Sequence, residues 1–130
     1  MIGIISDTHD NLEAVDRAVE YLNSRDLEMV IHAGDYISPF TAIRLKRLNA
    51  EIVGVFGNND GEKAGLLKEL PMLVELAEFE HRKKRFAVYH GTINTVVDAL
   101  VKSKKYDIVI TGHAHRPKIK NEDGVLLINP

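Results

Sequence analysis

Cysteine is absent from this chain of 130 residues. Without it the protein can form no disulfide and no thiolate metal site, so a metal ion must bind to histidine, carboxylate, amide or water ligands. No apolar run approaches the roughly 18 residues that a membrane span needs. The N-terminal segment has neither the basic region nor the cleavage pattern of a signal peptide. We therefore expect a cytoplasmic protein with no membrane partner.

An excess of charge of either sign is also missing. The chain has 17 Lys and Arg against 19 Asp and Glu, which gives a net charge of −2. This balance argues against broad affinity for nucleic acid or membranes. With 45% apolar residues, a chain of this length can bury a real hydrophobic core. We expect one domain that spans residues 1–130.

Apolar runs and helical patterns alternate in the first half of the chain. Strands are predicted at residues 2–5, 29–33 and 52–56 because these runs are short and rich in β-branched residues. Three helices are predicted between and after them, from helical spacing, cap residues and proline. Their apolar stripes are Leu12, Val15, Val19 and Leu22 after Asn11; Phe40, Ile43 and Leu48 after Ser38-Pro39; and Leu66, Leu67 and Leu70 before Pro71.

Strand pairs become more frequent in the second half. Residues 73–80 and 85–89 are predicted strands around a basic turn, residues 106–111 form another, and residues 118–120 and 125–128 form a final hairpin. A helix that carries Val97, Leu100 and Val101 is predicted after Asn94 as its cap. This order favours an α/β layered fold with largely parallel central strands.

Polar clusters follow five of these strands. They read Asp7-Thr8-His9, Gly34-Asp35, Gly57-Asn58-Asn59-Asp60, His90-Gly91 and Gly112-His113-Ala114-His115. Ligands bind at the carboxyl ends of the strands in open α/β sheets, so five such loops can converge on one site. The glycines in four of these clusters fit sharp turns and a close approach of the backbone.

The residue types in these clusters suit divalent metal ions. Carboxylate and imidazole are good ligands for Mn²⁺, Fe, Zn²⁺ and Ni²⁺. Seven candidate ligands are too many for one ion with an open position, and they suit two ions that share a bridging carboxylate. Two ions about 3.5–4 Å apart can polarise a phosphoryl group and generate a bound hydroxide. The candidate ligands are Asp7, His9, Asp35, Asn58, His90, His113 and His115.

Each cluster alone has an ordinary structural interpretation. Asp7 and Asp35 could form turns or cap helices, the Asn58 cluster is a turn signal, and His90 could be a buried histidine with satisfied hydrogen bonds. The two imidazoles in the loop from His113 to His115 are the strongest individual signal. The combination of all five clusters, each after a strand, favours the metal site.

The five blocks resemble those of the calcineurin-like metallophosphoesterase superfamily. Its pattern is D-x-H, then G-D, G-N-[HN]-[DE], a lone H, and G-H-x-H, and all five are present in this order over nearly the whole chain. The compact size and the Ile128-Asn129-Pro130 ending resemble the small prokaryotic phosphodiesterase branch. The resemblance implies an α/β/β/α sandwich.

The resemblance also implies roles for the ligands. Asp7, His9 and His115 would bind a first metal, Asn58, His90 and His113 a second, and Asp35 would bridge both. The nucleophile would be a hydroxide that bridges the ions. Mn²⁺ is the expected metal, with Ni²⁺, Fe, Zn²⁺ and Mg²⁺ as alternatives. Activity should fall as pH drops, because histidine must be neutral to bind a metal.

Two positions depart from the pattern of the family. Asn59 stands where many members have a histidine near the leaving group, and Thr92 stands where many small relatives have another histidine. Asparagine can hydrogen-bond a phosphoryl oxygen but cannot protonate an alkoxide. Asp35 and Asn59 are the predicted catalytic residues, with Asn59 and Thr92 as substrate contacts, and we expect a bias toward good leaving groups.

Some features fall outside the ligand blocks. The small branch usually continues beyond Asn-Pro with further strands, so either the C-terminal strands are truncated here or one sheet is shortened and exposes an edge. Asp60 and His32 are predicted to be structural. His81 lies in a basic turn, predicted to be a solvated hairpin, with contact to phosphate or nucleic acid as the alternative.

The leading prediction is a metal-dependent phosphodiesterase that acts on a small phosphate-ester substrate. One alternative is a nuclease, which the near-neutral charge disfavours. The other is a non-catalytic scaffold, since the fold also resembles the scaffold subunit of the retromer coat, and the intact ligand blocks disfavour it. The chain has neither a Walker-type phosphate loop nor a serine nucleophile elbow. The sequence leaves a homodimer or homotetramer open.

Overall fold

The computed structural model describes residues 1–130 and contains two sheets. The first has the order β1-β2-β3 and is entirely parallel; its strands are β1 (Ile2–Ile5), β2 (Met29–His32) and β3 (Glu51–Gly54). Helices α1 (Leu12–Asn23) and α2 (Pro39–Leu45) connect these strands, and α3 (Lys63–Glu69) follows β3. The predicted strands and helices of this half are therefore confirmed to within a few residues.

The second sheet has the order β4-β5-β6-β8-β7. Its central strands β5, β6 and β8 are parallel, while β4 and β7 pair antiparallel at the two edges. Helix α4 links β5 to β6. The bounds are β4 (Leu76–His81), β5 (Lys84–Tyr89), α4 (Asn94–Lys102), β6 (Ile108–Ile110), β7 (Lys118–Glu122) and β8 (Val125–Asn129). The prediction of largely parallel central strands is confirmed.

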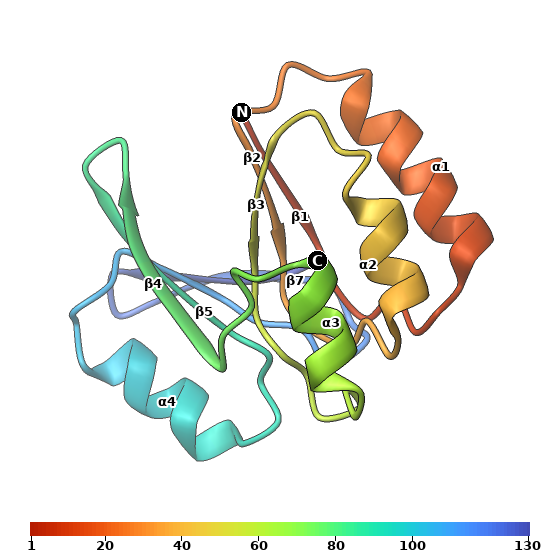
Figure 1. Cartoon of the computed structure of the whole chain (residues 1–130). Helices are drawn as coiled ribbons and strands as arrows, with labels where there is room; N and C mark the ends of the chain where they lie inside the picture. The colour runs from red at the N-terminus through yellow and green to blue at the C-terminus, as the bar shows by residue number, and fades with distance from the viewer.

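The two sheets pack face to face between two helical layers. Helices α1, α2 and α3 lie on the outer side of the first sheet and α4 lies on the outer side of the second (Figure 1). Buried residues between the sheets include Ile31 from β2 and Val88 from β5. Side chains alternate between the two faces of a strand, so in β8 Leu127 packs against α4 and Ile128 packs between the sheets. The predicted α/β/β/α sandwich is confirmed.

Three details of the helices differ from the sequence prediction. Phe40 and Ile43 are 65% and 46% exposed, because α2 instead buries Ala42 and Leu45, which lie three residues apart on another face of this short helix. Leu67 is exposed as well. Asn94 is the first residue of α4 rather than its cap, and no side chain caps this helix. In contrast, Asn11 accepts a hydrogen bond from the backbone N–H of Ala14 (3.1 Å) and caps α1 as predicted.

No helix of the structure has the length and apolar character needed to cross a membrane.

Candidate metal centre

The predicted ligands gather where β1, β2, β3, β5 and β6 end. Ligand atoms within 4.8 Å of one another form two groups: Asp7, His9 and His115; and Asp7, Asp35 and His90. These residues come from loops that are more than a hundred positions apart in the chain. The convergence of the strand ends thus assembles two adjoining sets of potential metal ligands.

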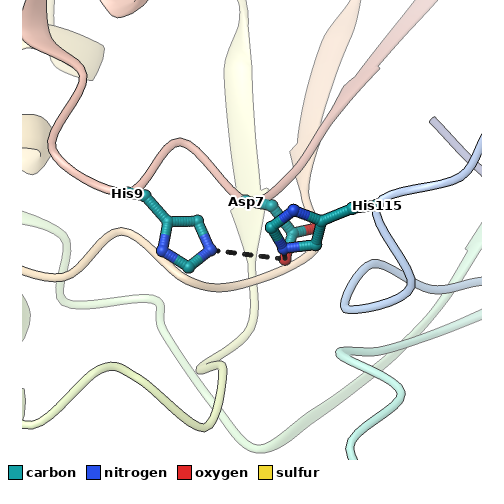
Figure 2. A group of neighbouring side chains, drawn as sticks. All are labelled: Asp7, His9 and His115. Atoms are coloured by element: carbon teal, nitrogen blue, oxygen red, sulfur yellow. Dashed lines mark ion pairs between the residues drawn. The ribbon is translucent and has the colours of Figure 1, made fainter.

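The first group surrounds the carboxylate of Asp7. Figure 2 shows His9, Asp7 and His115 gathered together, with a dashed line from the ring of His9 to the carboxylate of Asp7. Asp7 Oδ1 lies 3.3 Å from His115 Nε2 and 3.8 Å from His9 Nε2, and the two ring centroids are 5.2 Å apart. Atoms that share one ion at about 2.1 Å lie about 3.0–3.4 Å apart in tetrahedral or octahedral geometry. The group therefore needs only small side-chain adjustments to hold an ion.

Asp35 lies between the two predicted ligand sets and is 1% exposed. Its Oδ2 is 3.3 Å from His9 Nε2 and 3.4 Å from His90 Nε2. Burial acts to raise the pKa of Asp35, but hydrogen bonds from Asn59 and the nearby imidazoles outweigh it and hold the pKa below its ordinary value. The carboxylate is therefore ionised and available as a ligand at neutral pH.

His90 is oriented by the backbone of the first sheet. Its Nδ1 lies 2.7 Å from the carbonyl oxygen of Ala33, which can only accept, so Nδ1 carries the proton. The lone pair of Nε2 then faces Asn58 Oδ1 at 3.0 Å and Asp35. In metal-binding histidines, a hydrogen bond from the ring nitrogen that does not bind the metal fixes the tautomer and the ring orientation. Ala33 is thus a contributor that sequence patterns did not identify, because a backbone carbonyl leaves no signature in the sequence.

The remaining predicted site residues lie in the same cluster. The ring of His113 packs edge-on against that of His90 at 5.2 Å, and its backbone N–H donates to Asp7 Oδ2 at 3.0 Å. Thr92 lies beside Asn58, with its Oγ1 3.5 Å from the side-chain oxygen. Asn59 donates to Asp35 from both its backbone N–H and its side-chain amide, at 2.9 and 2.8 Å. The structure therefore brings all the predicted residues to one place.

Asp60 ties the loops after β2 and β3 together. One carboxylate oxygen accepts from the backbone N–H groups of Asp35 (3.0 Å) and Gly57 (2.7 Å), and the other from that of Ile37 (2.8 Å). Burial raises the pKa of Asp60, and these three hydrogen bonds oppose the rise. The structural role predicted for Asp60 is confirmed, but the two-loop bridge depends on contacts that sequence alone does not define.

Left-handed backbone is frequent at the predicted ligands. Five of the seven have positive φ without being glycine, a conformation that costs about 1–2 kcal/mol for most residues. Backbone hydrogen bonds hold this geometry, from Asp7 N–H to Gly34 O (2.9 Å) and from His9 N–H to Asp35 O (3.1 Å). Strained backbone of this kind clusters at functional sites. The five are Asp7 (53°), His9 (46°), Asp35 (61°), His113 (65°) and His115 (49°).

His32 is a buried support of the site. Its Nδ1 accepts from the backbone N–H of Gly34 (3.2 Å), so Nε2 carries the proton and donates to Thr8 Oγ1 (3.1 Å). Its ring stacks on Tyr36 with centroids 3.9 Å apart. The structural role predicted for His32 is confirmed: it links the loop after β1 to the one after β2.

We expect His32 to make the metal-free protein acid-labile. Burial, with a smaller effect of His90, lowers the pKa of His32 to about 3. In the unfolded chain His32 takes up a proton at about pH 6.5, whereas in the folded chain it stays neutral down to about pH 3. The free energy of unfolding therefore falls as pH drops from about 6.5 toward 3, by up to about 1.4 kcal/mol per pH unit. Urea unfolding in EDTA between pH 4 and 7 should show a shallower slope for His32→Gln than for wild type. Equal slopes would contradict the buried neutral state.

His81 lies outside the metal centre. Its Nε2 is 3.1 Å from Glu28 Oε2, and Glu28 also pairs with Arg82 and with the N-terminal amine of Met1. This cluster is at the amino end of β1, whereas the ligands follow its carboxyl end. The structure therefore places His81 in an ion-paired hairpin rather than in the site.

The four-layer fold, with carboxylates, an amide and imidazoles gathered at one edge of its sheets, defines a metallophosphoesterase. The donor set fits divalent cations because it combines hard oxygen ligands with imidazole.

Comparison with known proteins gives the same result. Residues 1–130 match the calcineurin-like phosphoesterase superfamily domain. The chain therefore belongs to the calcineurin-like phosphoesterase superfamily. A phosphodiesterase of Methanocaldococcus jannaschii is 38% identical, over 99% of this chain and 81% of the relative.

Solved structures share the fold. An archaeal phosphodiesterase superposes with a TM-score of 0.95 at 38% identity, over 99% of this chain and 82% of the other. Vacuolar protein sorting 29 from Cryptosporidium parvum superposes with a TM-score of 0.77 at 20% identity, over 99% and 72%. At that identity the second match concerns the fold alone.

Proposed function

We propose that this chain is a phosphodiesterase that holds two divalent metal ions, with residues 1–130 acting as one domain. The observation that carries the proposal is the position of Asp35. Its Oδ2 lies 3.3 Å from an imidazole of one ligand set and 3.4 Å from an imidazole of the other. Asp35 is thus suited to bridge two ions, with Asp7, His9 and His115 on one and Asn58, His90 and His113 on the other.

The chain's own residues prepare this site for phosphate esters. Hydrogen bonds to Asp60 and Asn59 fix the loop that carries Asp35, and the Ala33 carbonyl orients His90. When bound, two ions would polarise the phosphoryl group and activate a water molecule as the nucleophile. Asn59 and Thr92 lie next to Asp35 and Asn58, where they can donate to phosphoryl oxygens. Mn²⁺ is the proposed metal, since carboxylate and amide oxygens suit it; the imidazoles keep Ni²⁺, Fe and Zn²⁺ as alternatives.

Asn59 should make the rate depend strongly on the leaving group. Its amide cannot protonate a departing alkoxide, and general-acid catalysis contributes about 10²–10⁴-fold. We expect the wild type to hydrolyse a methyl p-nitrophenyl diester, with loss of nitrophenolate, at least about 100-fold faster than a dialkyl diester. Asn59→His should lower the ratio of the two rates, because an imidazole can protonate a departing alkoxide. Similar wild-type rates for the two esters would contradict the assignment.

The experiment that tests the proposal is metal-dependent turnover of bis-p-nitrophenyl phosphate. The EDTA-stripped chain is reloaded separately with Mn²⁺, Ni²⁺, Zn²⁺ or Mg²⁺. We expect turnover that requires the metal and exceeds that of the monoester p-nitrophenyl phosphate. His81→Ala serves as the matched histidine control and should stay within a few-fold of wild type. Absence of metal-stimulated turnover would overturn the proposal, and loss of activity in the control would show a misassigned site.

The alternatives have less support. A nuclease would need an extended basic surface to track a nucleic-acid backbone, whereas the basic residues of the β4–β5 hairpin lie at the opposite edge from the predicted ligands and pair with Glu28 and Asp107. A non-catalytic scaffold would not need the full ligand set that this chain retains. A cytoplasmic location, and assembly as a homodimer or homotetramer, stay predictions.

A further inference from the structure

A pocket of about 360 Å³ opens beside the metal centre. His113, one of the proposed ligands, forms part of its wall together with Gly91, which directly follows His90. The pocket then extends toward the start of α4 and the start of β7, away from Asp7 and His9. Its size is that of a small-molecule site. A substrate whose phosphorus sits at the metals could therefore place an organic arm in this pocket.

The walls of the pocket carry positive charge and no negative charge. Arg116 and Lys118 line it, and none of its 12 lining residues is Asp or Glu. Arg116 forms no ion pair, while Lys118 pairs with Glu122 at 3.5 Å. In a chain of net charge −2, an arginine without an ion pair and a lysine with one long ion pair, on a concave surface with no acidic lining residue, point to an anionic ligand.

Two further polar features of the pocket have no side-chain hydrogen-bond partner: the start of α4 and the side-chain oxygen of Asn129. Helix α4 starts beside it with neither a side-chain cap nor an acidic residue in its first turn, so backbone N–H groups are available to an anion. Asn129 also lines the pocket and is only 5% exposed. Its amide nitrogen donates to the carbonyl oxygen of Gly112, but its Oδ1 accepts no hydrogen bond. A carboxylate has no donor to offer this oxygen, so an anion is expected to bind at Arg116 and the start of α4 rather than at Asn129.

We propose that this pocket binds a second anionic group, a carboxylate or a phosphate, on the non-leaving arm of the phosphodiester. The inference rests on the proposed function and deepens it by naming the substrate class. The reacting phosphoryl group lies at the metals, and Arg116 and Lys118 hold the charged end of the arm. The nature of the arm then determines which diesters are good substrates.

The test compares p-nitrophenyl diesters that differ only in the arm. One arm is 2-carboxyethyl, its neutral match is 2-carbamoylethyl, and a third is 2-phosphoethyl. The readout is the ratio of kcat/KM for a charged ester to that for the neutral ester, which cancels losses of metal or of folded protein. We expect a ratio of about two to five in the wild type, the effect of one favourable exposed ion pair. The ratio should fall as salt is raised.

Two lysines of β7 provide a matched control. Lys118 and Lys120 both pair with Glu122, at 3.5 and 2.9 Å, but only Lys118 lines the pocket. We expect Arg116→Gln to bring the ratio close to one and Lys118→Gln to lower it, while Lys120→Gln keeps the wild-type value. The larger ratio among the two charged esters identifies the preferred anion.

The outcomes separate this inference from the proposed function. Two results overturn the pocket assignment alone. One is that the wild type hydrolyses the neutral ester as well as the charged esters, so that the kcat/KM ratio is one. The other is that Lys118→Gln and Lys120→Gln lower this ratio equally. Failure of the metal-loaded wild type to hydrolyse any of the three esters overturns the phosphodiesterase proposal and this inference with it.

Discussion

Asp35→Ala is expected to remove both metal ions and nearly all activity. The carboxylate is 1% exposed and touches imidazoles of both ligand sets, so its loss deprives each ion of a ligand. Metal ions contribute several kcal/mol to stabilisation of the transition state, and about 4 kcal/mol corresponds to a factor of about 1,000. We therefore expect kcat/KM for bis-p-nitrophenyl phosphate to fall at least about 1,000-fold. Steady-state kinetics and elemental analysis of the same samples measure both effects.

Asp35→Asn distinguishes the loss of metal binding and activity from a loss of folding. Asparagine keeps the shape of aspartate and tolerates the left-handed backbone at this position (φ 61°), but it provides a neutral ligand. It should retain a cooperative unfolding transition while metal content and activity fall. Asp123→Asn, in the exposed turn between β7 and β8, is the matched control with wild-type activity. A metal-loaded and active Asp35→Asn protein would contradict the bridging role.

Gly57→Ala should damage the site through steric overlap alone. A Cβ atom at this position would overlap Asp35 Oδ1 and the backbone nitrogen of Asp35. The N–H of Gly57 also donates to Asp60 at 2.7 Å, so the loop has little freedom to move away. Overpacking of this kind typically costs about 1–3 kcal/mol, and displacement of Asp35 should also lower metal affinity. Urea unfolding in EDTA and Mn²⁺ titration by calorimetry measure the two effects.

Gly61 provides the matched control for this substitution. It lies in the same loop, but a Cβ there would meet no atom within 4 Å. Gly61→Ala should therefore leave both stability and Mn²⁺ affinity near wild type. If Gly57→Ala bound Mn²⁺ as tightly as Gly61→Ala, the close approach of this loop to Asp35 would not matter for the site.

The loops that carry the predicted ligands could be recognised from sequence because each one is defined by a short, continuous segment. A short apolar strand followed by Asp7-Thr8-His9 or by Gly34-Asp35 is recognisable without long-range information, and parallel strands bring such loops to one edge. The strand order that brings them together follows from the alternation of strands and helices. For this reason the layered fold and the gathering of the ligands both agree with the prediction.

Other features depend on contacts between distant segments. The exposure of Phe40 and Ile43 was not predicted, because the buried face of α2 is chosen by its packing against α1 and α3. The three hydrogen bonds to Asp60 and the contact of His90 with the carbonyl of Ala33 involve backbone atoms, which every residue type provides. The pocket beside His113 is lined by residues of α4, β7 and β8, and no local sequence motif predicts that these elements lie together.

The most direct test of the account is the number and position of bound metals. Crystals of the chain loaded with Mn²⁺, examined by anomalous diffraction, should show two peaks about 3.5–4 Å apart on either side of Asp35. One peak should lie near Asp7, His9 and His115, and the other near Asn58, His90 and His113. A single peak, or two peaks without Asp35 between them, would contradict the two-metal centre.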